Sequence, residues 1–254
     1  MKIELQNISA RYGKKTVLRN LDFVFNPGKI YGIIGANGTG KSTLIKILAR
    51  ILTPSTGKIT WNGKALAEIS SKNLAKKLAL LPQHPPIPEE LSVEELVYLG
   101  RLPHQSWCRR YTERDKSAVM QALAECNLNG LKQRLVNTLS GGEQQRAWLA
   151  LTLAQQPETL LLDEPATGLD IKAQQEFFAY LRAGQAQRNL TVIMVIHDLN
   201  SALRNCDELL LLHNESIAVH GAAAAVLTPE NVTKYFQITP CCGTAADGLP
   251  YILT

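Results

Sequence analysis

Continuous apolar runs of strand length, each bounded by turn residues, recur along the chain. Runs of this kind predict strands that are buried on both faces, as in a parallel sheet. They occupy residues 29–34, 79–81, 160–162 and 191–196. Apolar positions at helical spacing follow the first and the last of these runs, over residues 43–52 and 199–206. This alternation of strands with helices predicts an α/β fold.

The first part of the chain has a different pattern. Apolar and polar positions alternate from the start, as they do in a strand with one buried face. We expect shorter strands of an antiparallel sheet at residues 2–8, 17–25 and 58–62. The pair Asn62-Gly63 is a turn signal at the end of the third strand.

A helical segment is predicted between two of the buried strands. Prolines stiffen a loop at residues 82–88, because each proline ring fixes its backbone dihedral. Helical spacing follows over residues 92–100, 113–126 and 142–155, so residues 83–157 are expected to form a helical insert. Beyond it, we expect a hairpin turn at 214–215 and a helix capped by Thr228, with Pro229 in its first turn.

Length and composition agree with a folded globular chain. It has 254 residues, of which 45% are hydrophobic and 19% are charged. The longest apolar runs are far shorter than the roughly 20 residues that a membrane-spanning helix needs. The N-terminal segment lacks the apolar stretch of a signal peptide, so we expect a cytoplasmic protein.

Charge and cysteine usage restrict the partners only weakly. A formal net charge of +5 permits nucleic acid or an anionic membrane surface as a partner and requires neither. Basic residues at 109–116 alternate with acids, which favours a solvated helix face over a nucleic-acid patch. The five cysteines lack C-x-x-C spacing and are odd in number, which favours thiols over a disulfide framework or a metal site. They are Cys108, Cys126, Cys206, Cys241 and Cys242.

A phosphate-binding pattern, G-x-x-x-x-G-K-[ST], occupies residues 35–42, directly after a predicted strand and before a predicted helix. In such a loop the glycines let successive backbone N–H groups wrap around the β- and γ-phosphate oxygens. Lys41 supplies a compact positive charge, and Ser42 offers its hydroxyl to Mg²⁺. The pattern therefore predicts binding of a nucleoside triphosphate.

Two adjacent carboxylates, Asp163 and Glu164, end the predicted strand at 160–162. Acids at strand ends often make salt bridges only, and this alternative stays open for a single aspartate. As a pair they fit two tasks: Asp163 would stay ionised and hold the metal, while Glu164 would accept the proton of a water molecule attacking the γ-phosphate.

Three further side chains are candidates because they follow predicted strands. Ligands of open α/β sheets collect beyond the carboxyl ends of the strands. His197 would sense the γ-phosphate at that position, although a lone histidine is more often structural. Gln83 could reach Mg²⁺ or the attacking water. Tyr12 could stack on a purine, although a lone tyrosine is more often a core or surface residue.

The segment LSGGEQQR, residues 139–146, places two glycines at the start of a predicted helix. Ser140 and Glu143 fit a capping box, in which their side chains satisfy unpaired amides at the helix N-terminus. A capping box does not require Gly141 or Gly142, and glycine destabilises a helix interior by roughly 0.5 to 1 kcal/mol relative to alanine. Bare backbone at a helix N-terminus suits an anion, so we also expect a phosphate site here.

Together these motifs resemble the nucleotide-binding subunit of ABC transporters over nearly the whole chain. They follow that family's order and spacing, as Tyr12, residues 35–42, Gln83, residues 139–143, Asp163-Glu164, Gly168-Leu169-Asp170 and His197. One departure is Glu143, where the family's signature commonly has glutamine. Residues 81–84, 91–97 and 100–104 are similar to the ATPase subunits of iron-siderophore, haem and cobalamin importers.

The resemblance implies a P-loop NTPase of the ABC ATPase fold, with a RecA-like core, an antiparallel β subdomain and an inserted α-helical subdomain. It implies one ATPase domain over residues 1–254, with 1–82 and 158–220 as the catalytic core, 83–157 as the helical subdomain and 221–254 as a C-terminal tail. The expected catalytic residues are Glu164, His197 and Lys41, and the expected Mg²⁺ ligands are Ser42, Gln83 and Asp163. The expected ATP-binding residues are Tyr12, Gly35, Asn37, Gly38, Thr39, Gly40, Lys41, Ser42, Thr43, Gln83, Ser140, Gly141, Gly142, Glu143, Asp163 and Asp170.

The resemblance also implies partners. Two copies placed head to tail would bring each signature segment onto the other copy's γ-phosphate, with two ATP molecules between them. Separate permease subunits are expected, with an extracytoplasmic substrate-binding protein acting indirectly, no nucleic acid, and a peripheral location on the cytoplasmic face of the inner membrane. The alternative is a soluble ABC ATPase without a permease, such as an iron–sulfur cluster assembly ATPase. A repair or translation ABC protein would need a long coiled coil or tandem cassettes, and the chain has neither.

Overall fold

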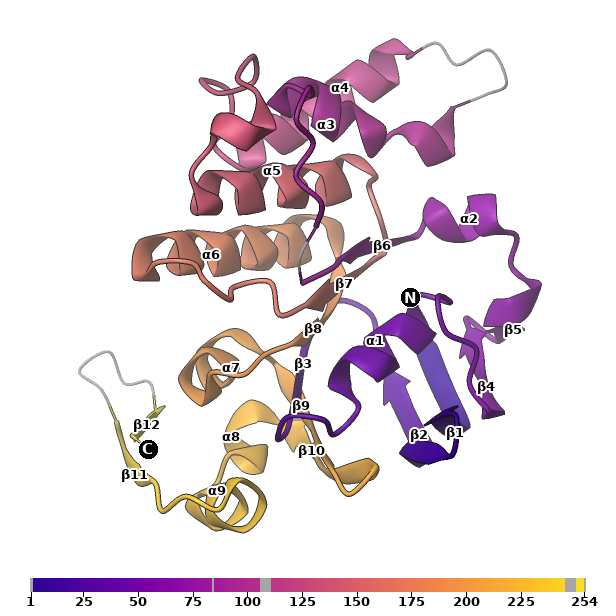
Figure 1. The fold of residues 1–254 in the computed structure, drawn as a ribbon, viewed down its shortest axis with the longest axis vertical. Helices are drawn as coiled ribbons and strands as arrows, with labels where there is room; N and C mark the ends of the chain where they lie inside the picture. The colour runs from indigo at the N-terminus through magenta and orange to yellow at the C-terminus, as the bar shows by residue number, and fades with distance from the viewer. Residues whose placement is uncertain (1, 84, 106–110, 245–249, 254) are drawn as a thin grey trace. The chain divides into compact units, whose positions relative to one another are not determined.

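A computed structural model describes residues 2–83, 85–105, 111–244 and 250–253 and divides the chain into two compact units (Figure 1). The first unit comprises Met1–Ile69, Leu161–Glu164 and Thr191–Thr254. The second unit comprises Ser70–Leu160 and Pro165–Leu190. In the part of the chain that the structure describes, no helix is both long and apolar enough to span a membrane.

A largely parallel sheet forms the centre of the first unit. Within this unit its strands follow the order β10-β9-β3-β8-β7, and β3 is parallel to both β8 and β9. Every residue of β3, β7 and β8 is buried, which confirms the prediction of strands buried on both faces. The strands are β3 (Ile30–Ile34), β7 (Thr159–Asp163), β8 (Thr191–Val195), β9 (Glu208–His213) and β10 (Ser216–Ala222).

The strands near the N-terminus form a second, antiparallel sheet of order β2-β1-β4-β5. It consists of β1 (Ile3–Tyr12), β2 (Lys15–Phe25), β4 (Thr56–Trp61) and β5 (Lys64–Ala65). The predicted turn joins β4 to β5, with Asn62 and Gly63 both at positive φ. The helical elements of the first unit are α1 (Lys41–Leu48), η1 (Leu66–Glu68), α7 (Leu199–Asn205), α8 (Ala223–Val226) and α9 (Pro229–Phe236). The strands β11 (Cys241–Thr244) and β12 (Pro250–Leu253) form an antiparallel hairpin, and β12 packs on α7.

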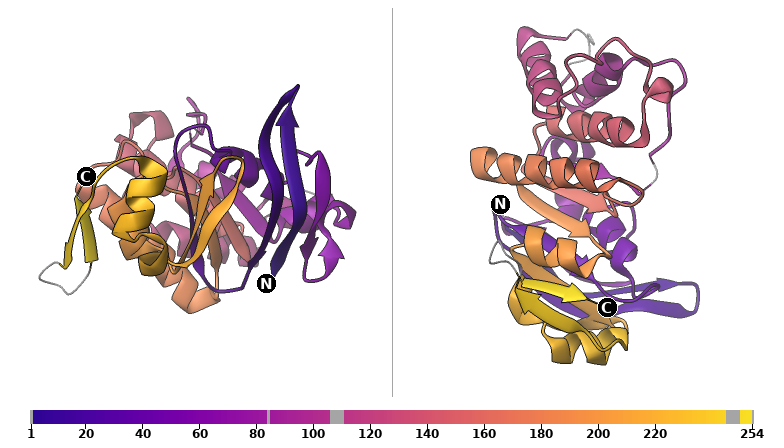
Figure 2. Two further views of the ribbon diagram at one scale, coloured as in Figure 1. Left: turned by 90° about the horizontal axis from the view of Figure 1, so that it is seen from below. Right: turned by 90° about the vertical axis from the view of Figure 1, so that its left-hand side faces the viewer.

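The second unit is mainly helical. Its elements are α2 (Ser71–Ala75), β6 (Leu78–Leu81), α3 (Val93–Leu99), η2 (Leu102–His104), α4 (Glu113–Glu125), η3 (Val136–Thr138), α5 (Gly141–Ala154) and α6 (Ile171–Arg188). Helices α3, α4 and α5 pack on one another, and α6 runs alongside α5 (Figures 1 and 2). Strand β6 is a neighbour of β7, whose first two residues also belong to this unit.

The structure corrects the sequence expectations at several places. The helix expected over 43–52 ends at Leu48, because Arg50 takes the left-handed conformation at φ 57°. Helix α6 and the hairpin β11–β12 were not expected. Within the predicted solvated face at 109–116, Asp115 is only 4% exposed, and residues 109 and 110 lie outside the described part of the chain, as does Cys108.

Candidate functional site

The loop at residues 35–42 joins the carboxyl end of β3 to α1, as the sequence predicts. Gly35 and Gly40 have φ of 143° and 96°, values that L side chains rarely adopt. A Cβ at Gly35 would lie 2.4 Å from the carbonyl oxygen of Leu212, and one at Gly40 would lie 2.5 Å from Leu18 Cδ2. Both positions therefore exclude a side chain for two independent reasons.

Lys41, near the end of this loop, is buried. Its Nζ donates hydrogen bonds of 2.9 Å to the carbonyl oxygens of Gly35 and Ala36. Burial lowers the pKa of Lys41, while the negative charges of Glu164 and Asp163 act against that shift. The loop thus holds an ammonium group next to backbone positions suited to a phosphate.

Ser42 and Asp163 meet across the same loop. The Ser42 hydroxyl donates a 2.9 Å hydrogen bond to Oδ1 of Asp163 at the end of β7. Burial raises the pKa of Asp163, and the Ser42 hydrogen bond opposes that rise. A hydroxyl and a carboxylate are hard oxygen ligands that suit Mg²⁺, which takes few protein ligands and fills its shell with phosphate and water oxygens. Among the described residues, no group of three His, Cys, Asp or Glu side chains could hold a metal by itself.

Glu164 and His197 form a direct pair in the first unit. His197 Nε2 lies 2.6 Å from Glu164 Oε1, since β7 and β8 are neighbours in the sheet and end side by side. Glu164 has φ 52°, a left-handed conformation that is uncommon for a residue with a side chain. Strained backbone of this kind persists where the surrounding structure enforces it, and it is concentrated at functional sites.

The structure gives less direct support for the other candidate residues of the first unit. Tyr12 ends β1 and is 49% exposed, so its ring can stack on a base. Thr39 Oγ1 donates to the carbonyl oxygen of Ala36, and Thr43 is buried in the first turn of α1. Asn37 lies exposed in the loop.

The capping box predicted at the start of α5 is confirmed. The Ser140 backbone N–H and hydroxyl donate to Glu143 Oε2 at 2.8 and 2.9 Å, and the Glu143 N–H donates to Ser140 Oγ at 3.4 Å. These hydrogen bonds, first from the backbone and then from the hydroxyl of Ser140, lower the pKa of Glu143. The carboxylate of Glu143 is therefore engaged in capping its own helix.

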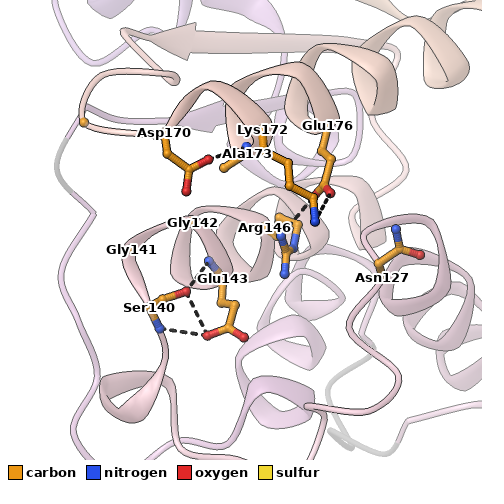
Figure 3. A pocket seen from close by; sticks show the side chains of 11 residues that line it. Asn127, Ser140, Gly141, Gly142, Glu143, Arg146, Asp170, Lys172, Ala173 and Glu176 are labelled. Atoms are coloured by element: carbon orange, nitrogen blue, oxygen red, sulfur yellow. Dashed lines mark hydrogen bonds and ion pairs between the residues drawn. The ribbon is translucent and has the colours of Figure 1, made fainter.

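The glycines of this helix differ in their surroundings (Figure 3). A Cβ at Gly141 would meet no atom within 4 Å, whereas one at Gly142 would lie 3.1 Å from Ala173 Cβ. A cavity of about 480 Å³ opens beside them and is also lined by Asp170 and Lys172. Asp170 caps α6 by accepting a 2.8 Å hydrogen bond from the Ala173 N–H.

The structure divides the predicted residues between its two units. Tyr12, residues 35–43, Asp163, Glu164 and His197 lie in the first, whereas Gln83, residues 140–143 and Asp170 lie in the second. Gln83 lines a cavity of about 290 Å³ together with Ile87 and Trp148. His84 lies outside the described residues.

Two side chains beyond the predicted motif also make specific contacts. Gln145 Nε2 donates to the carbonyl oxygen of Pro165 at 2.6 Å, and Arg146 Nη1 donates to Glu176 Oε2 at 3.1 Å. Both residues belong to the segment LSGGEQQR, but the expected phosphate-binding residues of that segment end at Glu143. The only local signal for these residues is their position one helical turn or less after the capping box, because their partners lie 20 and 30 residues away.

Comparison with known proteins identifies relatives along most of the chain. A family model described as "ABC transporter" matches residues 18–167. The achromobactin transport ATP-binding protein of Dickeya dadantii is 42% identical over 236 residues, which cover 93% of this chain and 88% of that protein. The iron(3+)-hydroxamate import ATP-binding protein of Bacillus subtilis is 39% identical over 236 residues, with 93% and 88% coverage.

Solved structures share the fold. An inward-facing structure of an ABC transporter assigned to the metal-chelate type superposes with a TM-score of 0.84 at 28% identity, covering 99% of this chain and 97% of that chain. A dimeric structure of a bacterial ABC transporter cassette superposes with a TM-score of 0.77 at 25% identity, covering 87% and 98%. These similarities confirm the P-loop ABC ATPase fold predicted from the sequence.

Proposed function

The chain belongs to the ABC transporter family as an ATP-binding subunit, and we propose that it hydrolyses ATP to power the import of an iron-siderophore or a related metal chelate such as haem or a cobalamin. The names of its relatives support this cargo class, since the proteins of Dickeya dadantii and Bacillus subtilis are called transport or import proteins for achromobactin and iron(3+)-hydroxamate. The alternative of a soluble ABC ATPase without a permease has no such support among these relatives.

We assign the chemistry of hydrolysis to the first unit. Tyr12 stacks on adenine, and the loop amides with Lys41 bind the β- and γ-phosphates. Ser42 and Asp163 would hold Mg²⁺, which would neutralise phosphate charge when bound. Glu164 accepts the proton of the attacking water, and the side chain of His197 orients that carboxylate and the γ-phosphate. The 2.6 Å contact between His197 Nε2 and Glu164 Oε1 is the observation that carries this assignment.

A second copy of the chain completes each site. The start of α5 presents Gly141 with open space where a Cβ would be, at a helix N-terminus suited to an anion. In a head-to-tail dimer, residues 140–143 and Asp170 of one copy would face the γ-phosphate bound by the partner copy. The dimeric ABC cassette of similar fold supports this arrangement.

We further propose that the ATPase dimer docks on permease subunits at the cytoplasmic face of the membrane, as a peripheral protein, with a substrate-binding protein acting on the far side. The surface we assign to the permease includes Gln83, Pro85 and Ile87, which line a cavity of the helical unit. We propose that residues 1–254 form one ATPase domain, with 1–82 and 158–220 as its catalytic core, 83–157 as its helical subdomain and 221–254 as a tail.

The substitution Glu164→Gln tests the catalytic assignment. It keeps the shape of the side chain and removes the base, so turnover should fall by about 10²- to 10⁴-fold while ATP still binds. Size-exclusion chromatography with ATP should show a stable dimer for the variant and a transient one for the wild type. Rapid hydrolysis by the variant would exclude Glu164 as the base.

Purification from solubilised membranes tests the transport assignment. A tagged chain expressed at native level should be recovered with integral membrane subunits, which mass spectrometry identifies. Recovery with soluble partners alone would favour the soluble ATPase.

A further inference from the structure

The three residues that follow the capping box, Gln144, Gln145 and Arg146, have no part in the proposed chemistry, yet each makes a specific contact. Gln144 Nε2 donates to the carbonyl oxygens of Val136 and Leu139, both at 3.2 Å, and so anchors the chain that enters α5. Gln145 and Arg146 reach a different segment, which begins immediately after Glu164 and continues into α6.

Gln145 holds the first carbonyl group after the proposed catalytic base. Its donor must be the amide NH₂ group, because the partner oxygen of Pro165 can only accept. The 2.6 Å distance makes this a short hydrogen bond. Pro165 opens the turn that leads to Asp170, so this bond ties the start of that turn to α5.

Two further contacts join α5 to the first turns of α6 (Figure 3). Arg146 and Glu176 form a partly buried ion pair at 3.1 Å, with side chains 18% and 32% exposed. One turn earlier, the backbone of Gly142 approaches Ala173 so closely that an added Cβ would lie 3.1 Å from Ala173 Cβ. The signature glycines and the Asp170 cap therefore line one cavity, from two helices that are joined at several points.

The geometry points to Gln145 as a positioning residue for ATP hydrolysis. Its hydrogen bond ties α5, whose first residues would face the partner's phosphate, to residues 165–170, which follow the proposed catalytic base. These two segments are thereby held in a fixed position relative to each other. This inference rests on the proposed function, because it requires a dimer in which both segments face the partner copy. A positioning error of about 1 Å costs an enzyme on the order of 100-fold in rate, which sets the scale of the effect.

Three substitutions of Gln145 test the hydrogen bond. Gln145→Met keeps the length and removes the donor, Gln145→Glu replaces the donor by a charged acceptor that faces a carbonyl oxygen, and Gln145→Lys restores a donor. We expect kcat to fall about 10- to 100-fold for the methionine and glutamate variants and to recover in part for lysine. The affinity of the monomer for ATP, measured with a fluorescent ATP analogue, should stay within twofold of the wild type.

The matched control is Gln121→Met on α4, because Gln121 is an exposed glutamine that donates to Glu125 in the same unit. It should hydrolyse ATP at the wild-type rate. Equal kcat for the wild type and all three Gln145 variants would overturn the inference. So would a decrease in kcat that parallels the decrease in melting temperature across the variants, with no recovery of kcat in the lysine variant. A wild-type chain that hydrolyses no ATP would instead overturn the proposed function itself.

Discussion

A buried ion pair in the helical unit leads to a quantitative prediction about stability and pH. Arg101 is 1% exposed, and its Nε donates a 2.8 Å hydrogen bond to Asp115 Oδ1. Its Nη1 donates to the carbonyl oxygen of Ala154, in the last turn of α5. Asp115 also accepts hydrogen bonds from the backbone N–H and the hydroxyl of Thr112, which cap α4.

The size of the effect follows from the pKa of Asp115. Burial acts to raise this pKa, but the hydrogen bonds from Thr112 and the contact with Arg101 outweigh it and lower the pKa from 3.8 to about 2. A depressed carboxyl pKa contributes stability that is present above the unfolded-state value and is lost as the pH falls through the folded-state value. The shift corresponds to roughly 2 kcal/mol in full, of which about 1 kcal/mol is lost between pH 7 and pH 3.

The substitution Asp115→Asn isolates this contribution. It leaves Arg101 buried without a countercharge, so at pH 7 the variant should be less stable by about 3 kcal/mol. Thermal and urea unfolding followed by circular dichroism, from pH 7 to pH 3, should show this difference shrinking by about 1 kcal/mol. Glu113→Gln on the same helix is the control, because the Glu113 carboxylate is exposed and should contribute below about 0.5 kcal/mol. A difference between wild type and Asp115→Asn that does not change with pH would refute the reasoning.

Five further substitutions address the proposed nucleotide sites. Gly141→Asp should stabilise α5 by about 0.3 to 1 kcal/mol in thermal unfolding yet reduce hydrolysis at least about 100-fold, whereas Gly142→Asp should lower both, because its Cβ crowds Ala173. Glu143→Gln keeps an acceptor for the helix cap and removes a negative charge, so half-maximal hydrolysis should need less ATP; a higher requirement would contradict this. Ser42→Cys should lose activity with Mg²⁺ and regain part of it with Mn²⁺ in the same steady-state assay. His197→Ala should reduce kcat about 100-fold with ATP affinity retained, and unchanged kcat would remove His197 from the site.

The sequence predicted those elements that depend on interactions between residues close together in the chain. The fully buried strands β3 and β8 were visible as continuous apolar runs, and the capping box of α5 follows from the side chains of two residues three positions apart. The loop at 35–42 was predictable because glycine spacing, a lysine and a hydroxyl in one octapeptide leave few other structures.

The features that were missed depend on contacts between distant positions. Helix α6 buries only four of its 18 residues, so it lacks the regular apolar stripe that marks a helix in a sequence. The burial of Asp115 depends on Arg101, 14 positions earlier, and a charged residue carries no local sign that a partner will accompany it into the interior. The bond from Gln145 to Pro165 likewise joins residues 20 apart.

Helix α5 is anchored at each end by different contacts. Loss of the contacts at one end should affect stability, and loss of the contacts at the other end should affect catalysis. At its C-terminal end, Arg101 binds the carbonyl oxygen of Ala154, and His104 Nε2 lies 2.9 Å from the carbonyl oxygen of Gln155. Burial lowers the pKa of His104, so its ring stays neutral near pH 7 and donates to that carbonyl. These contacts lie about 20 Å along the helix from Gly141, at 1.5 Å per residue, and are far from any phosphate bound there. Loss of the Arg101 anchor should therefore reduce the free energy of unfolding, whereas loss of the Gln145 bond should reduce kcat in a chain that remains folded.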